Sequence, residues 1–101
     1  MYQKKEMHAG LEEFRSTPNA LLVDVRNPSE YNNGHIPGSM NVPLHTIDDV
    51  EFLVENKEDP LYVYCYTGAR CYQAVSQLQE MGFQNVKNIG GIAAYSGKVV
   101  V

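Results

Sequence analysis

A cysteine and an arginine stand close together in the segment Cys65-Tyr66-Thr67-Gly68-Ala69-Arg70, and both side chains could take part in chemistry. The reactive form of cysteine is the thiolate, and nearby positive charge or a helix N-terminus favours it by lowering the pKa of the thiol. Arg70 supplies a permanent charge and a forked donor for oxyanions. Gly68 allows the backbone angles with which a tight loop turns its N–H groups inward to bind an anion. The segment therefore predicts a nucleophilic thiolate, Cys65, that faces an anion.

The elements around this segment place Cys65 at the end of a strand. Residues 61–65 form a continuous apolar run opened by Pro60, which is typical of a strand buried on both faces. Residues 70–81 carry apolar side chains at helical spacing, and Gly82 follows as a C-cap. The start of this helix adds the positive end of its dipole to the loop. Ligands bind beyond the carboxyl ends of parallel strands, so we expect the site there.

Similar patterns predict the other elements. Apolar runs and short candidates predict strands over residues 20–25, 85–89, 2–7 and 39–42. Helical spacing predicts helices over residues 9–14 and 47–56. Strands that alternate with helices indicate a mostly parallel sheet covered on both faces. No repeat or linker divides the chain, so we expect one domain over residues 1–101.

Composition excludes several classes of protein. The 101 residues are 44% apolar and 20% charged, close to globular averages. The net charge of −4, with scattered Lys and Arg, argues against a nucleic-acid partner. No apolar stretch suits a membrane span or a secretory signal, so we expect a cytoplasmic protein without a membrane partner. Two cysteines without a second pair or nearby histidines indicate neither a disulfide framework nor a zinc site.

The pattern Cys65-x-x-Gly68-x-Arg70 resembles the active-site loop of single-domain rhodanese-like sulfurtransferases. The resemblance extends along the chain in the family's order and spacing, from about residue 21 to residue 95. Its upstream part comprises Leu22-Val23-Asp24-Val25-Arg26, Glu30-Tyr31 and Gly34-His35-Ile36-Pro37-Gly38-Ser39. Its downstream part comprises Gly82-Phe83, Val86 and Gly90-Gly91.

The resemblance implies a rhodanese-like three-layer α/β fold with a five-stranded, mostly parallel central sheet flanked by helices. It also implies transfer of a sulfane sulfur through a persulfide on Cys65. The donor would be thiosulfate or a related persulfide, and the acceptor cyanide or a thiol such as glutathione or a thioredoxin-like protein. The reaction needs no cofactor, and the N–H groups of residues 66–70 would stabilise the bound anion. We expect the protein to be a monomer or a homodimer.

Several residues are expected to support the site. By period-two alternation Asp24 and Arg26 lie on the same side of a strand, and the resemblance implies structural roles for both, with Asp24 hydrogen-bonded near the loop. His35 is expected to hydrogen-bond backbone in its turn rather than to act as a general base. The remaining substrate-binding positions are those of the loop itself, namely Tyr66, Thr67, Gly68 and Ala69.

Two positions depart from the family's usual pattern. Tyr95 stands where relatives often carry tryptophan, and we expect it to be a packing anchor. Cys71 stands where relatives usually have a small hydroxyl residue or alanine. At a helix N-terminus it is a candidate resolving thiol for an oxidised Cys65, although packing against the sheet is its favoured role.

Two other functions compete with sulfur transfer. Cys-dependent phosphatases and arsenate reductases of the related loop type also combine a cysteine, inward amides and an arginine. Their loop is usually longer, whereas four residues separate Cys65 from Arg70 here, and none of them is an acid that could protonate a leaving alcohol. The other rival is a non-catalytic rhodanese-fold binding module, which commonly lacks the cysteine.

Overall fold

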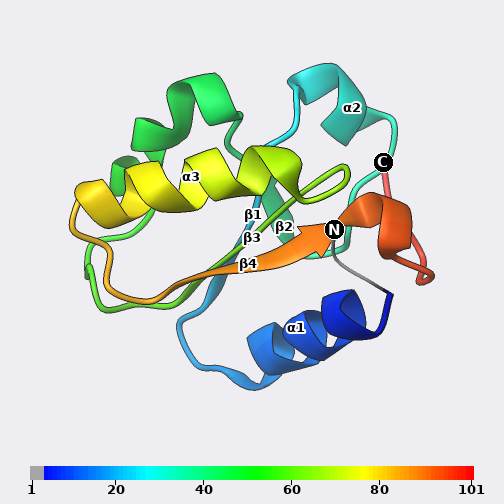
Figure 1. Cartoon of the computed structure of the whole chain (residues 1–101), viewed down its shortest axis with the longest axis horizontal. Helices are drawn as coiled ribbons and strands as arrows, with labels where there is room; N and C mark the ends of the chain where they lie inside the picture. The colour runs from blue at the N-terminus through cyan, green and yellow to red at the C-terminus, as the bar shows by residue number, and fades with distance from the viewer. Residues whose placement is uncertain (1–3) are drawn as a thin grey trace.

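The computed structural model describes residues 4–101 and shows helices and strands in alternation (Figure 1). In chain order the elements are α1 (Lys4–Ser16), β1 (Leu21–Asp24), α2 (Pro28–Asn32), β2 (Ser39–Asn41), the 3-10 helix η1 (Leu44–Phe52), β3 (Leu61–Cys65), α3 (Ala69–Glu80), β4 (Val86–Gly91) and the 3-10 helix η2 (Ile92–Ala94).

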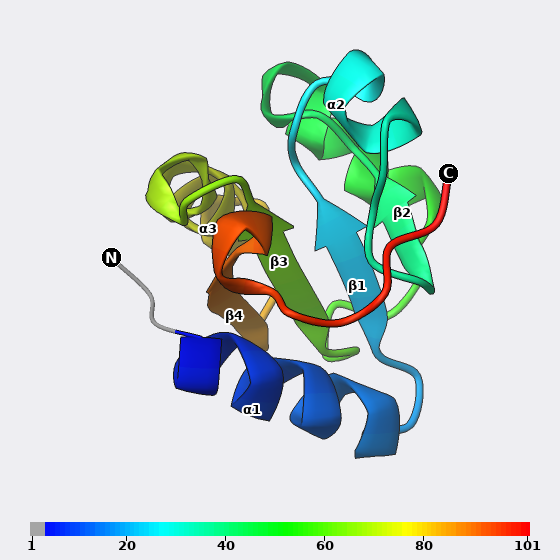
Figure 2. The same cartoon turned by 90° about the vertical axis from the view of Figure 1, so that its right-hand side faces the viewer.

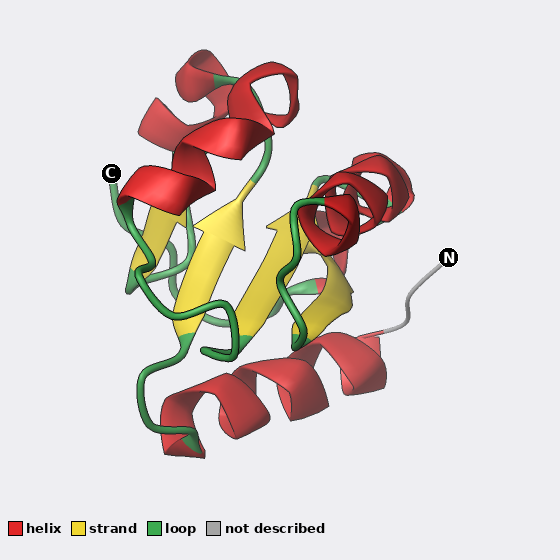
Figure 3. Ribbon diagram, turned by 90° about the vertical axis from the view of Figure 1, so that its left-hand side faces the viewer, coloured by secondary structure: helices red, strands yellow, loops and turns green. Residues whose placement is uncertain are grey.

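The strands form one parallel sheet in the order β2-β1-β3-β4. Because all four strands run the same way, their carboxyl ends meet at one edge, where Asp24 of β1 and Cys65 of β3 lie on neighbouring strands. Helix α1 covers one face of the sheet, and α3 with η1 covers the other (Figure 3). The C-terminal segment continues from η2 past β1 (Figure 2), and Val100 pairs with His35 in an antiparallel bridge.

Alternation along the strands divides the core into two apolar clusters. Leu22, Tyr62 and Tyr64 point toward α1 and pack with Met7 and Leu11. The alternate strand residues, among them Val63 and Cys65, face α3 and η1. All five residues of β3 are buried, as the continuous apolar run predicts for a central strand. Cys65 is therefore held between the sheet and α3.

The structure confirms most of the predicted elements. The strand over residues 61–65 is β3, and the helix predicted over residues 70–81 is α3, displaced by one residue at each end. The strands predicted over residues 20–25, 39–42 and 85–89 are β1, β2 and β4, each with slightly different ends.

Two predictions need correction. The strand predicted over residues 2–7 is wrong from Lys4 onward, since Lys4–Ser16 form α1, whereas Tyr2 and Gln3 lie outside the described residues. Met7 and Leu11, four positions apart, are both fully buried, which is helical and not strand periodicity. Within residues 4–101 the sheet consequently has four strands rather than five.

The segment predicted as a helix over residues 47–56 is instead the 3-10 helix η1, which begins and ends earlier. Its buried residues, Ile47 and Val50, are three positions apart, the spacing that a 3-10 helix brings to one face. None of the helices in the described part of the chain is long and apolar enough to cross a bilayer.

Candidate active site

The chain between β3 and α3 wraps around the sulfur of Cys65. Cys65 ends β3 with 1% of its surface exposed, and α3 begins four residues later at Ala69. Gly68 is the N-cap residue of α3 with φ of 102°, a left-handed conformation that favours glycine. Its N–H group donates to Cys65 Sγ over 2.9 Å. The glycine thus turns the backbone so that an amide points at the thiol.

The surroundings of Cys65 favour its ionised form. A hydrogen bond from the Cys71 thiol, together with backbone N–H groups of Cys71, Gly68 and Arg70, lowers the pKa of Cys65 to about 6 against the opposing effect of burial. Hydrogen bonding to Cys65 and burial raise the pKa of Cys71, so its thiol stays protonated. Cys65 is therefore largely a thiolate at neutral pH, which is the nucleophilic state that its position predicts.

Cys71 lies in the first turn of α3, fully buried in the apolar cluster between the sheet and α3. Its Sγ is 3.6 Å from the carbonyl oxygen of Gly90 in β4. Both cysteines are free thiols in this structure. Cys71 thus packs against the sheet and also contacts the nucleophile.

Strand β4 and the residue Ala93 of η2 contact the loop. Gly91 is paired with Cys65 in the sheet, and a Cβ atom at Gly91 would lie 2.5 Å from Thr67 Cα. Ala93 N–H donates to the Tyr66 carbonyl over 3.0 Å, and Asn88 Nδ2 donates to the Gly68 carbonyl over 3.4 Å. The sequence does not predict Asn88, Gly91 or Ala93 as site residues. The glycine pair at 90–91 is the available signal, because glycine inside a strand often marks a close backbone approach.

The Arg70 guanidinium is engaged by a carboxylate. Its Nη1 and Nη2 atoms contact Glu30 Oε1 and Oε2 over 2.9 Å and 3.0 Å. Glu30 also accepts the Asn27 N–H over 3.0 Å at the start of α2, and Arg70 is the main cause that lowers the pKa of Glu30 to about 2. Sequence analysis assigned Glu30 no role in the site. Its spacing of three residues from Asn27, typical of a helix N-terminus, explains its conformation but not its partner.

Asp24 and Arg26 form a buried ion pair at the end of β1. The Asp24 carboxylate accepts hydrogen bonds from Arg26 N over 2.9 Å and from Arg26 Nη2 over 2.7 Å. Arg26 Nη2 also donates to the Gly34 carbonyl over 2.8 Å. The pair therefore ties the end of β1 to the turn that contains His35.

His35 makes backbone and stacking contacts. Its Nδ1 lies 2.9 Å from the Tyr31 carbonyl oxygen, and its ring stacks on the Tyr31 ring with centroids 3.7 Å apart. Tyr95 stacks on His8 with centroids 5.5 Å apart, and its hydroxyl donates to the Lys98 carbonyl over 2.8 Å. Tyr66, by contrast, has 53% of its surface exposed at the mouth of the loop.

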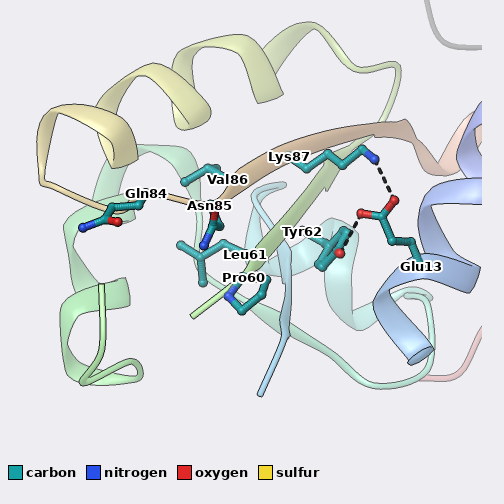
Figure 4. Close-up of a pocket in the computed structure, with 8 residues that line it drawn as sticks. All are labelled: Glu13, Pro60, Leu61, Tyr62, Gln84, Asn85, Val86 and Lys87. Carbon is teal, nitrogen blue, oxygen red and sulfur yellow. Dashed lines mark hydrogen bonds and ion pairs between the residues drawn. The ribbon is translucent and has the colours of Figure 1, made fainter. Parts of the chain in front are cut away.

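Two hollows lie at opposite ends of the sheet. One, of about 430 Å³, lies where β3 and β4 begin (Figure 4), and its charged groups satisfy one another, since Glu13 contacts Lys87 over 2.9 Å and accepts from Tyr62 over 2.7 Å. The other, of about 420 Å³, lies beside Arg70 at the carboxyl end. Its lining comprises Val25, Asn27, Leu44, His45, Arg70, Gln73 and Gln77. Only the second hollow adjoins the loop. Within residues 4–101 no three potential metal ligands cluster.

Comparison with known proteins agrees with this fold. The rhodanese-like domain family matches residues 6–98. Thiosulfate sulfurtransferase PspE of Escherichia coli is 38% identical over 69% of this chain and 68% of its own length. A solved structure described as a rhodanese with anions from E. coli is 34% identical, with a TM-score of 0.74 over 80% of this chain and 96% of that one. A tRNA uridine(34) hydroxylase of Hamiltonella defensa is 39% identical over 82% of this chain, which spans 25% of the hydroxylase.

The site thus combines a buried cysteine whose sulfur accepts from loop amides with a position at the carboxyl edge of a parallel sheet, surroundings that favour a thiolate. The chain belongs to the rhodanese-like domain family.

Proposed function

We propose that this protein is a sulfurtransferase that carries a sulfane sulfur as a persulfide on Cys65. The observation that carries the proposal is the contact of the Gly68 N–H with Cys65 Sγ over 2.9 Å, which together with the Cys71 thiol and the other loop amides lowers the pKa of Cys65 to about 6. A thiolate at neutral pH is the nucleophile that sulfur transfer requires. The relative named a thiosulfate sulfurtransferase supports the same reaction.

The reaction consists of two displacements at sulfur. The Cys65 thiolate attacks the outer sulfur of thiosulfate or of an organic persulfide, and the donor's S–S bond breaks so that sulfite or a thiolate leaves with the electron pair. Cys65 then carries a persulfide anion, to which the Gly68 N–H and its neighbours donate. An acceptor thiolate or cyanide attacks the terminal sulfur, and the Cys65 thiolate leaves unchanged.

We assign Arg70, with the loop residues Tyr66, Thr67, Gly68 and Ala69, to donor binding. As the acceptor of the sulfur we propose a thiol, such as glutathione or a thioredoxin-like protein. Cys71 keeps its proposed second role as a resolving thiol, in which it would condense with a peroxide-generated sulfenic acid on Cys65 to give a disulfide and water. Its contact with Cys65 supports this role, whereas its raised pKa makes it a slow nucleophile.

The hydroxylase relatives do not change this assignment. The part that aligns with this chain is 25% of the hydroxylase from Hamiltonella defensa, so the similarity does not extend to most of that protein. The net charge of −4 and the scattered basic residues also disfavour a tRNA surface on this domain.

Intact mass spectrometry after incubation with thiosulfate tests the proposal. We expect a mass gain of one sulfur atom that a reductant removes, and no gain in Cys65→Ser. The matched variant Cys71→Ser should still acquire the sulfur, because a hydroxyl can replace the thiol as a hydrogen-bond donor to Cys65. The mechanism would be overturned if folded Cys65→Ser acquired the sulfur, or if the unchanged protein acquired none from either thiosulfate or a persulfide.

A further inference from the structure

The charge of the loop's single basic side chain is already matched. Arg70 is the only Lys or Arg between positions 65 and 70. Both of its terminal nitrogens contact the Glu30 carboxylate, over 2.9 Å and 3.0 Å. About a third of each side chain is exposed, so the pair stands at the rim of the site rather than in the core. With Glu30 ionised, the pair has no net charge.

The ionised nucleophile makes the site negative overall. The Arg70–Glu30 pair contributes no net charge, and the Cys65 thiolate adds one negative charge. The nearby Arg26 guanidinium is neutralised by Asp24 over 2.7 Å. A donor therefore meets the backbone N–H dipoles and an Arg70 whose charge is already matched, while the Cys65 thiolate repels a dianion about twice as strongly as a monoanion.

The hollow beside Arg70 favours a donor with an organic body. Its volume of about 420 Å³ is within the range of about 300–1,000 Å³ that small-molecule sites have. Its polar lining includes the uncharged amides of Asn27, Gln73 and Gln77. Such amides can hydrogen-bond the amino and carboxylate groups of an amino-acid thiol, whereas thiosulfate would leave most of the hollow to water.

We propose that Glu30 is a specificity-determining residue, which makes Cys65 accept sulfur from organic persulfides in preference to doubly charged inorganic donors. This inference rests on the proposed function. Glu30 acts by holding the Arg70 guanidinium in a bidentate contact and by cancelling its positive charge. That positive charge would attract a dianion about twice as strongly as a monoanion, so cancelling it separates the two classes of donor.

The test compares thiosulfate with cysteine persulfide as donors. For each, kcat/KM for loading sulfur onto Cys65 is measured in the unchanged protein, in Glu30→Gln and in Glu51→Gln. Glutamine keeps an oxygen for the Asn27 N–H but loses the charge and the second oxygen that accepts from Arg70. Glu51→Gln is the matched control, because it removes a charge from another surface ion pair, the one with Lys57.

We expect Glu30→Gln to raise the ratio of kcat/KM for thiosulfate to that for cysteine persulfide by about fivefold, mainly through KM. Added salt should reduce the effect, because the pair is partly exposed. Glu51→Gln should leave the ratio unchanged. An unchanged ratio would overturn the inference. If kcat/KM then falls equally for both donors, Glu30 only supports Arg70. Absence of sulfur on Cys65 from both donors in the unchanged protein would instead overturn the proposed function.

Discussion

Replacing Gly91 with alanine would push the loop away from Cys65. A Cβ atom at this position would lie 2.5 Å from Thr67 Cα and would also meet the Tyr66 carbonyl. Carbon atoms pack no closer than about 3.5 Å, so the loop backbone must retreat by roughly 1 Å. Gly91 is paired with Cys65 in the sheet, so β4 itself has little freedom to yield.

The size of the effect follows from the bonds that the retreat would stretch. Folding lowers the pKa of Cys65 from 9.0 to about 6, which corresponds to about 4 kcal/mol. Moving the Gly68 N–H by roughly 1 Å from its 2.9 Å contact would break that hydrogen bond, at a cost of about 1.5–3 kcal/mol for a charged acceptor. The pKa of Cys65 should rise by about one to two units, and the thiolate fraction at pH 7 should fall from about nine-tenths to between about a half and about a tenth.

The assay is the rate of Cys65 alkylation by iodoacetamide against pH, with the modified peptide identified by mass spectrometry. The midpoint should move upward by about one to two pH units in Gly91→Ala. Gly82→Ala is the control, since Gly82 has a positive φ of 101° that alanine would strain, but its Cβ would meet nothing within 4 Å. It should lose stability without any change in midpoint. A folded Gly91→Ala protein with an unchanged midpoint would refute the idea that β4 shapes the loop.

Two further predictions concern stability. Asp24→Asn leaves Arg26 buried without its counter-charge, so we expect the free energy of unfolding in urea to fall by about 3–5 kcal/mol. Glu51→Gln, in the exposed pair with Lys57, should lower it by less than about 1 kcal/mol, and equal losses in the two variants would contradict this expectation. Because folding lowers the pKa of Cys65 from 9.0 to about 6, the unfolded chain binds more protons between these values, and stability should rise with pH across that window by up to about 4 kcal/mol. Cys65→Ala should remove this rise, and an unchanged slope would show that the thiolate is not stabilised by folding.

Local sequence patterns are sufficient to predict β3 and α3, the two elements that flank the Cys65 loop. The apolar run opened by Pro60 predicts β3 with its observed ends, and helical spacing followed by Gly82 predicts α3 to within one residue. These signals lie within a few residues of the structure that they specify. The strand prediction fails from Lys4 onward because the helical period of α1 is visible only when Met7 is taken together with Leu11, both of which are buried.

By itself, then, the sequence determined that Cys65 ends a buried strand, that Gly68 turns the loop and that Arg70 lies in the first turn of a helix. Only the tertiary structure decided which groups meet them. Glu30 is 40 positions from Arg70 and contacts it because α2 folds over the carboxyl end of the sheet. Gly91 reaches the loop only through the pairing of β4 with β3. Strand order and register bring such distant residues together, and neither is encoded in the pattern of any single segment.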